Sequence, residues 1–450
     1  MQKCLCVIAV LAAISSPLRA ATELQYSGTL TQLSRSGPST PVKQFDVYVL
    51  VRPDGDGRQC FYQLSERGGG GWAWPERFGQ ITLNAEDQKS AGRPAHILHM
   101  HDGTNYPVEL AAPFFEFSEK IAPDAKWTAG KLSYEVSRER NVAERDCWQI
   151  DAADNFGRRQ SFFVAKDSAL LVAAERRVFM GQGDEFQLRM ELASSRDLNG
   201  DALTLTATVA DGLISLQSAL DREDGETKPE LSSEQLETTT AALTGLVAAS
   251  SKTPLKNLVV AISRDVSSQS RRTDDIASLA KRFVGQPSPD FTLTTLKKKT
   301  VSLKSQKGRV TVLHFWDYKG DPITEPYGQV GYLDFLLTRR GRLGVDVFGV
   351  AVNSGFGDPK KTGAALRSVR KLRDFMNLSY PIAMDAGGTL EKFGDPRALG
   401  AKLPVWVVIG ADGKIAHYHV GFYSIKADQG LSELDAAVVR TIRDSRTRPE

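Results

Sequence analysis

Cysteine is scarce in this 450-residue chain, which contains only Cys4, Cys6, Cys60 and Cys147. Residues 148–450 therefore hold no thiol. Disulfide exchange requires a thiolate that attacks a disulfide sulfur, so this long part of the chain has no group of its own for that reaction. Because Cys4 and Cys6 lie in the N-terminal apolar segment, the pair left in the rest of the chain is Cys60 and Cys147.

Recognisable catalytic and nucleotide-binding motifs are missing as well. The sequence contains no G-x-S-x-G, no H-E-x-x-H, no Walker loop and no dinucleotide fingerprint. The formal net charge is only +3, so nothing indicates electrostatic binding to nucleic acid or to an acidic membrane. These absences leave conventional catalysis without a visible site, and we expect no cofactor.

Long apolar runs are absent apart from one at the N-terminus, where the basic Lys3 precedes the run CLCVIAVLAAI. This run is shorter than the roughly 20 residues that span a bilayer. A basic start, a short apolar run and the small Ala20 are typical of a secretory signal peptide. We therefore expect residues 1–20 to be removed, the mature protein to be periplasmic or extracellular, and no transmembrane segment to remain.

The two cysteines of the mature chain most simply form a disulfide, because export leads to an oxidising compartment. The sequence predicts a bond between Cys60 and Cys147 on this ground. A redox-active pair or a metal site is the alternative. The two residues lack the close Cys-x-x-Cys spacing that lowers the pKa of a thiol.

Residues 21–194 read as a β-rich domain, since short alternating runs such as QFDVYVLVRP and KLSYEVSRE are separated by turn residues. Few helical patterns intervene, and this favours a curved antiparallel sheet. Residues 195–283 read as a mainly helical connector. Ser232 and Gln235 predict a capping box there, Thr273 is a candidate cap for a later helix, and LTLTATV at 203–209 could add a strand.

Residues 284–450 have a different pattern. An apolar run at 310–316 ends in a polar turn, and a helical pattern follows from residue 327. The later order is strand, helix, strand, strand, helix, which predicts an α/β unit with a mixed sheet. The expected fold class is therefore α+β multidomain, with an antiparallel β-rich domain, a helical connector and a C-terminal α/β domain.

Several residues of this last region follow a known pattern. Phe315 and Trp316 end the first core strand, Leu403 and Pro404 precede an apolar strand, and an opening G-x-P-x-P-D-F-x-L pattern is carried by Gly285, Pro287, Pro289, Asp290, Phe291 and Leu293. The region resembles the thioredoxin-like superfamily, specifically the redoxin branch of AhpC/TSA peroxiredoxins and TlpA- or ResA-like exported thioredoxins. This resemblance implies a thioredoxin fold with a cis proline at Pro404.

The resemblance breaks at the reactive turn. The family carries a Cys-x-x-Cys shortly after the tryptophan that ends the first core strand, and the matching positions here are Gly320 and Ile323. Neither residue supplies a thiolate, so the resemblance implies the fold and not the activity. We expect no catalytic residue in this turn, which is either a binding surface or an inert closure of the core.

A binding role is what the resemblance leaves. In thioredoxins the active turn and the cis-proline loop form a groove that holds an extended peptide. The resemblance implies that this groove is lined here by Trp316, Tyr318, Pro322, Leu403 and Pro404. A protein or peptide is the expected partner at this groove.

Two sets of histidines are candidate metal ligands. His99 and His101 share one face of a predicted strand and His96 lies on the other, but no third ligand is evident. His417 and His419 share a face of the last hairpin, and would need to meet His314 in space. Core or exposed histidines explain both sets more simply, so we expect no metal site.

The sequence therefore predicts an exported, non-catalytic binding or scaffold protein that uses the proline groove and the β-rich domain. Two alternatives stay open. One is a thiol–disulfide oxidoreductase in which Cys60 and Cys147 are the working pair. The other is a carrier of a lipid or another apolar ligand, because a concave sheet of this kind resembles the LolA-like carriers.

Overall fold

The computed structural model describes residues 21–34, 37–55, 57–83, 90–157, 159–222, 230–318, 329–423 and 431–447. The chain divides into two compact units, one that ends at Ser267 and one that begins at Ser268. The predicted signal segment, residues 1–20, lies outside the described residues. No helix among the described residues is long and apolar enough to cross a membrane.

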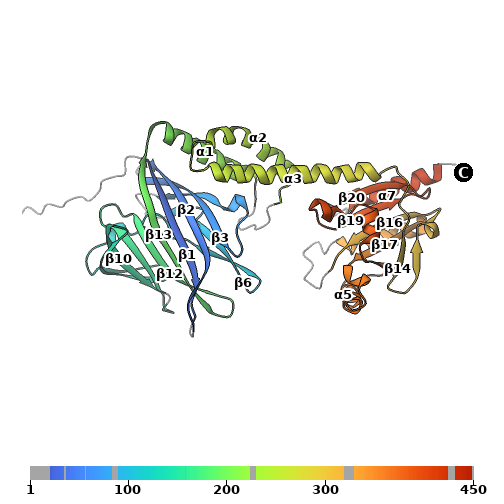
Figure 1. Cartoon of the computed structure of the whole chain (residues 1–450), viewed down its shortest axis with the longest axis horizontal. Coiled ribbons are helices and arrows are strands. Elements are labelled where there is room, and N and C mark those ends of the chain that lie inside the picture. The colour runs from blue at the N-terminus through green and yellow to red at the C-terminus, as the bar shows by residue number, and fades with distance from the viewer. Residues whose placement is uncertain are drawn as a thin grey trace, which may run out of the picture. The chain divides into compact units, whose positions relative to one another are not determined.

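The first unit is built on one large antiparallel sheet, as predicted (Figure 1). Its strand order is β5-β4-β3-β2-β1-β13-β12-β11-β10-β9-β8. The strands are β1 (Ala21–Gln32), β2 (Thr40–Asp54), β3 (Gly57–Gly68), β4 (Phe78–Leu83), β5 (Ser90–Gly92), β8 (Lys126–Ala129), β9 (Leu132–Val142), β10 (Arg145–Ala153), β11 (Arg159–Ala165), β12 (Leu171–Met180) and β13 (Asp184–Leu198). Neighbouring strands are mostly consecutive in sequence, so tight turns suffice to connect them.

Both faces of the sheet are buried, and different elements pack against each of them. One face packs against a separate hairpin, β6 (His96–His101) with β7 (Thr104–Glu109), and against the segment that follows it. The other face carries Tyr48, Leu50 and Phe61, which pack against helices. Because side chains alternate along a strand, one strand such as β2 supplies both faces.

Three helices follow β13: α1 (Gly200–Ala219), α2 (Ser233–Ser250) and α3 (Lys256–Phe283). The capping box predicted at Ser232 and Gln235 is present at the start of α2. The interpretation of 203–209 as a strand is wrong, since these residues lie inside α1. The cap predicted at Thr273 is also wrong, because α3 continues through this residue and its hydroxyl donates to the Gln269 carbonyl at 3.0 Å.

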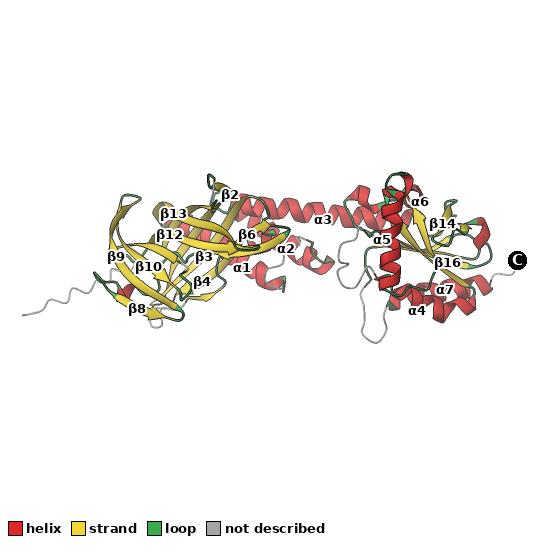
Figure 2. Cartoon of the chain, turned by 90° about the horizontal axis from the view of Figure 1, so that it is seen from below, coloured by secondary structure: helices red, strands yellow, loops and turns green. Residues whose placement is uncertain are grey.

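The second unit has a mixed sheet in the order β15-β14-β18-β17-β16-β19-β20, as predicted (Figure 2). Its strands are β14 (Thr292–Thr295), β15 (Thr300–Ser302), β16 (Val310–Trp316), β17 (Val345–Val352), β18 (Ile382–Asp385), β19 (Val405–Ile409) and β20 (Ile415–Val420). The central strand β16 is parallel to β17 and antiparallel to β19. All seven of its side chains are buried, since both faces of the sheet are covered.

Helices cover both faces of this sheet. The helices α4 (Tyr332–Arg340), α5 (Thr362–Phe375) and α7 (Ser432–Thr447) share a core with Val312 and Trp406. On the other face, α6 (Gly388–Lys392) and the end of α3 contribute Leu390, Phe393 and Phe283 to a core with Phe315. The side-chain alternation of β16 therefore divides this unit into two cores.

Candidate functional site

The end of β16 and the proline loop meet at one edge of the second sheet. Phe315 pairs with Val405 across β16 and β19, so the next residues in each direction, Trp316 and Pro404, lie side by side at the end of this ladder. The Leu403–Pro404 peptide is cis, and both residues are buried. The carbonyl of Pro404 accepts a hydrogen bond from the Gly421 N–H at 2.8 Å.

The residues after Trp316 are only partly described. Asp317 is exposed and Tyr318 is half-buried, and the Tyr318 carbonyl accepts a hydrogen bond from the Ser368 hydroxyl at 3.4 Å. The degenerate positions Gly320 and Ile323 and the predicted groove residue Pro322 lie outside the described residues. Of the predicted groove, the structure therefore brings together Trp316, Leu403 and Pro404, with Tyr318 two residues beyond the strand.

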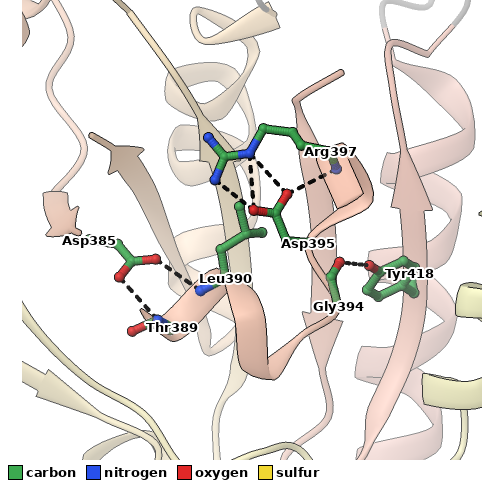
Figure 3. Close-up of polar contacts among 7 residues, drawn as sticks. All are labelled: Asp385, Thr389, Leu390, Gly394, Asp395, Arg397 and Tyr418. Atoms are coloured by element: carbon green, nitrogen blue, oxygen red, sulfur yellow. Dashed lines mark hydrogen bonds and ion pairs between the residues drawn. The ribbon is translucent and has the colours of Figure 1, made fainter. Parts of the chain in front are cut away.

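A polar cluster fixes the segment that leads to the proline loop (Figure 3). The Asp385 carboxylate accepts the backbone N–H groups of Thr389 and Leu390 at 3.0 and 2.9 Å, and so caps α6. The Tyr418 hydroxyl donates to the carbonyls of Phe393 and Gly394 at 2.9 and 3.0 Å. These bonds hold residues 385–394 before the chain turns toward Leu403.

Asp395 and Arg397 complete this cluster (Figure 3). The Asp395 carboxylate accepts the Arg397 backbone N–H at 3.0 Å and three hydrogen bonds from its guanidinium group. Burial alone would raise the pKa of Asp395, but the hydrogen bonds from Arg397 outweigh it and hold the pKa below its ordinary value. The carboxylate is therefore charged and engaged, so it is a structural group and not a free general base.

The predicted disulfide is not formed. Cys60 in β3 and Cys147 in β10 are both free thiols, and both are fully buried. The two residues share no ladder, because six steps separate β3 from β10 in the sheet order. The count of two cysteines in a chain expected to be exported suggested a bond, but both thiols are free in the structure.

Both thiols are also poor nucleophiles. Burial raises the pKa of Cys60 to about 12 and that of Cys147 to about 11. Thiolate is the reactive form, so at neutral pH neither side chain presents a significant reactive fraction. The predicted alternative of a working cysteine pair therefore lacks the acidity that thiol exchange needs.

A cavity lies on the face of the first sheet that carries the β6–β7 hairpin. Its volume is about 360 Å³. Leu83 of β4 and Leu132 of β9 both line it, although these strands are second from opposite edges of the sheet. The sheet must therefore curl around this space, so the face is concave, which the curvature of the sheet in Figure 2 illustrates.

The lining of this cavity is mostly apolar and aromatic. Phe114, Phe115, Tyr134, Phe162, Leu188 and Met190 contribute side chains to it. Five polar or charged residues also line it, namely Glu109, Glu116, Gln160, Glu175 and Arg176. Burial, followed by the charges of Glu109 and Glu119, raises the pKa of Glu116. A cavity of this size that combines apolar side chains with polar groups is typical of sites for small molecules.

An aromatic cluster supports one end of the cavity. The indole of Trp127 stacks on the Tyr134 ring with centroids 5.1 Å apart and planes at 1°. Phe115 packs against Tyr134 and Phe162 with centroids 6.4 and 5.4 Å apart. These rings come from β8, β9, β11 and the segment after β7, so they join the far edge of the sheet to the segment that crosses its face.

The histidines occupy two separate regions. His314 is fully buried and stacks on Trp406 with centroids 3.7 Å apart, and neither ring nitrogen has a hydrogen-bond partner among the described residues. The His417 Nε2 atom lies 2.7 Å from the Tyr423 hydroxyl, and the His419 ring stacks on the same tyrosine. These three histidines therefore line one aromatic row across β16, β19 and β20.

The other histidines lie on β6. His99 and His101 share a face, as predicted, with ring centroids 6.2 Å apart. No third polar partner is evident in the sequence, but the structure supplies one from β13, because the Asp184 carboxylate lies 2.8 Å from His101 Nε2. Sequence spacing carries no signal for this contact, because 83 residues separate the two positions.

Comparisons with known proteins concern the second unit. Residues 284–418 match the AhpC/TSA family. The thiol-disulfide oxidoreductase ResA of Bacillus thuringiensis subsp. konkukian is 27% identical over 156 residues, which are 34% of this chain and 76% of that protein. ResA of Bacillus anthracis is 26% identical over 148 residues, which are 32% of this chain and 74% of that protein.

Similar solved structures include a thioredoxin-family thiol:disulfide interchange protein from Chlorobium tepidum TLS, 20% identical, with 35% of this chain and 96% of that chain covered and a TM-score of 0.27. A secreted disulfide oxidoreductase of Mycobacterium tuberculosis is 20% identical, with 33% and 95% covered and a TM-score of 0.25. The family match and the ResA alignments, together with the mixed sheet and the proline before β19, identify the C-terminal region as a thioredoxin-like domain of the AhpC/TSA redoxin type.

Proposed function

We propose that the chain is an exported binding protein without thiol–disulfide activity. Its first unit would hold an apolar ligand in the concave cavity, and its redoxin domain would serve as a docking module. The observation that carries this proposal is the state of the thiols. The redoxin domain contains no cysteine, and the two cysteines after residue 20 are buried in another unit with raised pKa values.

The relatives are named thiol-disulfide oxidoreductases, and that activity does not transfer to this chain. Exchange begins with a thiolate and passes through a mixed disulfide, so it needs a sulfur at the reactive turn. The turn has Gly320 and Ile323 at the two matching positions. What can transfer is the peptide-binding edge, of which Trp316, Leu403 and Pro404 are in place.

The apolar-ligand part rests on the cavity of about 360 Å³. This volume falls within the range of about 300–1,000 Å³ that is usual for small-molecule sites. Phe115, Phe162 and Leu188 offer apolar contact area, and each buried CH₂ group of a ligand would contribute about 0.8 kcal/mol. Export is supported by the composition of residues 1–20, with Lys3 before the apolar run and Ala20 at its end.

Two assays test the absence of activity and the presence of a ligand site. In insulin reduction by dithiothreitol, the purified chain should leave the rate at that of the protein-free blank. Acceleration that is lost in Cys60→Ser would overturn the proposal. In a titration with the apolar probe N-phenyl-1-naphthylamine, the chain should bind the probe, and the fluorescence of the probe should increase.

A matched pair of variants assigns the probe to the cavity. Ala174 lines the cavity, whereas Ala153 of β10 does not, and both are half-buried positions on the same sheet. Ala174→Trp should fill part of the space and weaken probe binding about tenfold, and Ala153→Trp should leave it unchanged. Equal affinity in both variants would assign the probe elsewhere and remove the support for a carrier.

The docking role needs a test of its own. A photo-reactive residue at position 318 should cross-link an extended peptide or partner that occupies the groove, since Tyr318 follows Trp316 at its edge. Trp316 is too deeply buried for this purpose. The Pro404→Ala variant should reduce the yield, because Pro404 would contact the bound strand. Unchanged yield would show that the groove is not the docking surface.

A further inference from the structure

Two turns of the first unit bring three ligand-type atoms together. His101 ends β6, Asp102 follows it in the turn to β7, and Asp184 begins β13. The His101 Nε2 atom lies 2.8 Å from one Asp184 carboxylate oxygen and 3.7 Å from one of Asp102. All three ligand atoms lie within 4.8 Å of one another. The group is remote in sequence and compact in space.

We propose that His101, Asp102 and Asp184 form a binding site for a divalent transition-metal ion of the Zn²⁺ type. One imidazole and two carboxylates are ligands that Zn²⁺ accepts, at distances of about 2.0–2.2 Å. Donors on a tetrahedral ion of that size lie roughly 3.4 Å apart, a separation that falls between the 2.8 and 3.7 Å distances from His101 Nε2. Small rotations of the two carboxylates suffice, and water would complete the coordination.

The imidazole is held in place by its neighbours. Only 14% of the His101 side chain is exposed. The Phe186 ring meets it edge to face with centroids 5.1 Å apart, and the His99 ring stacks on it at 6.2 Å. A ligand whose rotamer is already fixed loses little conformational entropy on binding, which favours a specific site over transient contact with exposed acids.

The opposite turn leaves room beside the ligand atoms. Gly181 has φ 58°, and a Cβ at this position would lie 3.1 Å from the His101 ring and 3.3 Å from an Asp102 carboxylate oxygen. Glycine therefore allows the β12–β13 turn to approach the cluster closely. Its N–H donates to the Tyr106 hydroxyl at 3.1 Å, and this bond holds the turn against the hairpin.

An independent observation is the unused nitrogen of His99. This residue is only 6% exposed, and its Nδ1 atom has no hydrogen-bond partner among the described residues. Buried unpaired polar atoms are rare in native proteins, and a nearby ion is one explanation for such an atom.

The test uses the full chain without an affinity tag, stripped of metal by dialysis against a chelator. Zn²⁺ binding is measured by calorimetry, and Co²⁺ is titrated to observe the visible absorption of its d–d bands. We expect one ion per chain. His101→Ala and Asp184→Asn should each weaken binding by about tenfold or more, since each removes a direct ligand.

Two control variants sit next to the ligands. His96→Ala alters the strand of His101 on its opposite face. Glu185→Gln alters the residue after Asp184, and the Glu185 carboxylate pairs with Arg177 and not with the cluster. Both should bind as the unmodified chain does. Because Asp102 is 70% exposed, Asp102→Asn is the variant least able to disturb folding, and it carries the same expectation of weaker binding.

The proposal is overturned by either of two results. One is the absence of Zn²⁺ binding at concentrations up to about 1 mM. The other is Zn²⁺ binding that His101→Ala and Asp102→Asn leave unchanged. Binding of Ca²⁺ as tight as that of Zn²⁺ would count in the same way, because Ca²⁺ prefers oxygen ligands and would need no imidazole. Circular dichroism of each variant confirms that a loss of binding is not a loss of fold.

Discussion

Lys43 and Glu66 form an ion pair inside the first unit, with 3.2 Å between the ammonium nitrogen and a carboxylate oxygen and only 0% and 2% of the side chains exposed. The ammonium group also donates to the Gly70 carbonyl at 3.0 Å. The Glu66 carboxylate accepts the backbone N–H groups of Leu98 and Trp72 at 2.8 and 3.1 Å. The pair therefore joins β2 and β3 to the glycine-rich turn and to the hairpin over the cavity.

Removal of the lysine should be costly. In Lys43→Met the Glu66 carboxylate stays buried without a counter-charge, and breaking such a pair usually costs about 3–5 kcal/mol. The double variant Lys43→Met with Glu66→Gln removes the charge and keeps an acceptor for one of the two backbone N–H groups. It should recover part of the loss in urea unfolding. Equal stability of the single and the double variant would mean that the charges are not coupled.

Acid should destabilise the second unit through His314. Burial lowers the pKa of this histidine from 6.5 to about 3. Between these values the unfolded state binds a proton that the folded state does not, so stability is full above about pH 6.5 and is lost as the pH falls. From pH 7 to pH 5 this group should cost about 2 kcal/mol.

The variant His314→Phe isolates this contribution. Phenylalanine keeps the stacking on Trp406 and does not titrate. The urea midpoint of the second unit should fall less between pH 7 and pH 5 in this variant than in the unmodified chain. His417 and His419 also have lowered pKa values through burial, and they remain in both proteins. Parallel pH profiles would contradict the assignment to His314.

Thiol labelling should separate the folded from the unfolded chain. With residues 1–20 removed, the native protein should react with neither iodoacetamide nor a chromogenic disulfide at neutral pH, because Cys60 and Cys147 are buried and weakly acidic. In denaturant without reductant, mass spectrometry should find two labels. Finding no label there would indicate a disulfide and would contradict the two free thiols of the structure.

Loss of the Tyr418 hydroxyl should loosen the segment before the proline loop. Tyr418→Phe removes the donor for the carbonyls of Phe393 and Gly394, and should reduce the free energy of unfolding by about 1–2 kcal/mol. Hydrogen exchange should rise in residues 385–400. Tyr332→Phe, at the half-buried start of α4, is the matched control and should leave that segment unchanged.

Much of the fold could be predicted from local patterns. Strand alternation indicated the antiparallel sheet, and the order of apolar runs after residue 284 indicated the mixed sheet. The misassigned segment 203–209 shows the limit, because its threonines and branched residues suit either state. In α1 the hydroxyls of Thr204 and Thr208 donate to carbonyls four residues earlier, a local bond that a strand cannot offer.

The candidate sites were less accessible from the sequence. The groove residues Trp316 and Pro404 were found because a family pattern marks them. The cavity and the cluster around His101 depend on how the sheet curls and on which turns meet. A local sequence pattern predicts neither property. The predicted disulfide between Cys60 and Cys147 was wrong for the same reason, since an even number of cysteines does not show which of them lie close together.

Among the described residues, the large sheet ends in two very short strands, β5 with three residues and β8 with four. Its central strands β2 and β13 have fifteen residues each. An open edge presents unpaired backbone groups that can recruit a strand from another molecule, and shortening the edge limits that risk. A concave site can therefore remain open to a ligand while the molecule offers little template for self-association along the sheet.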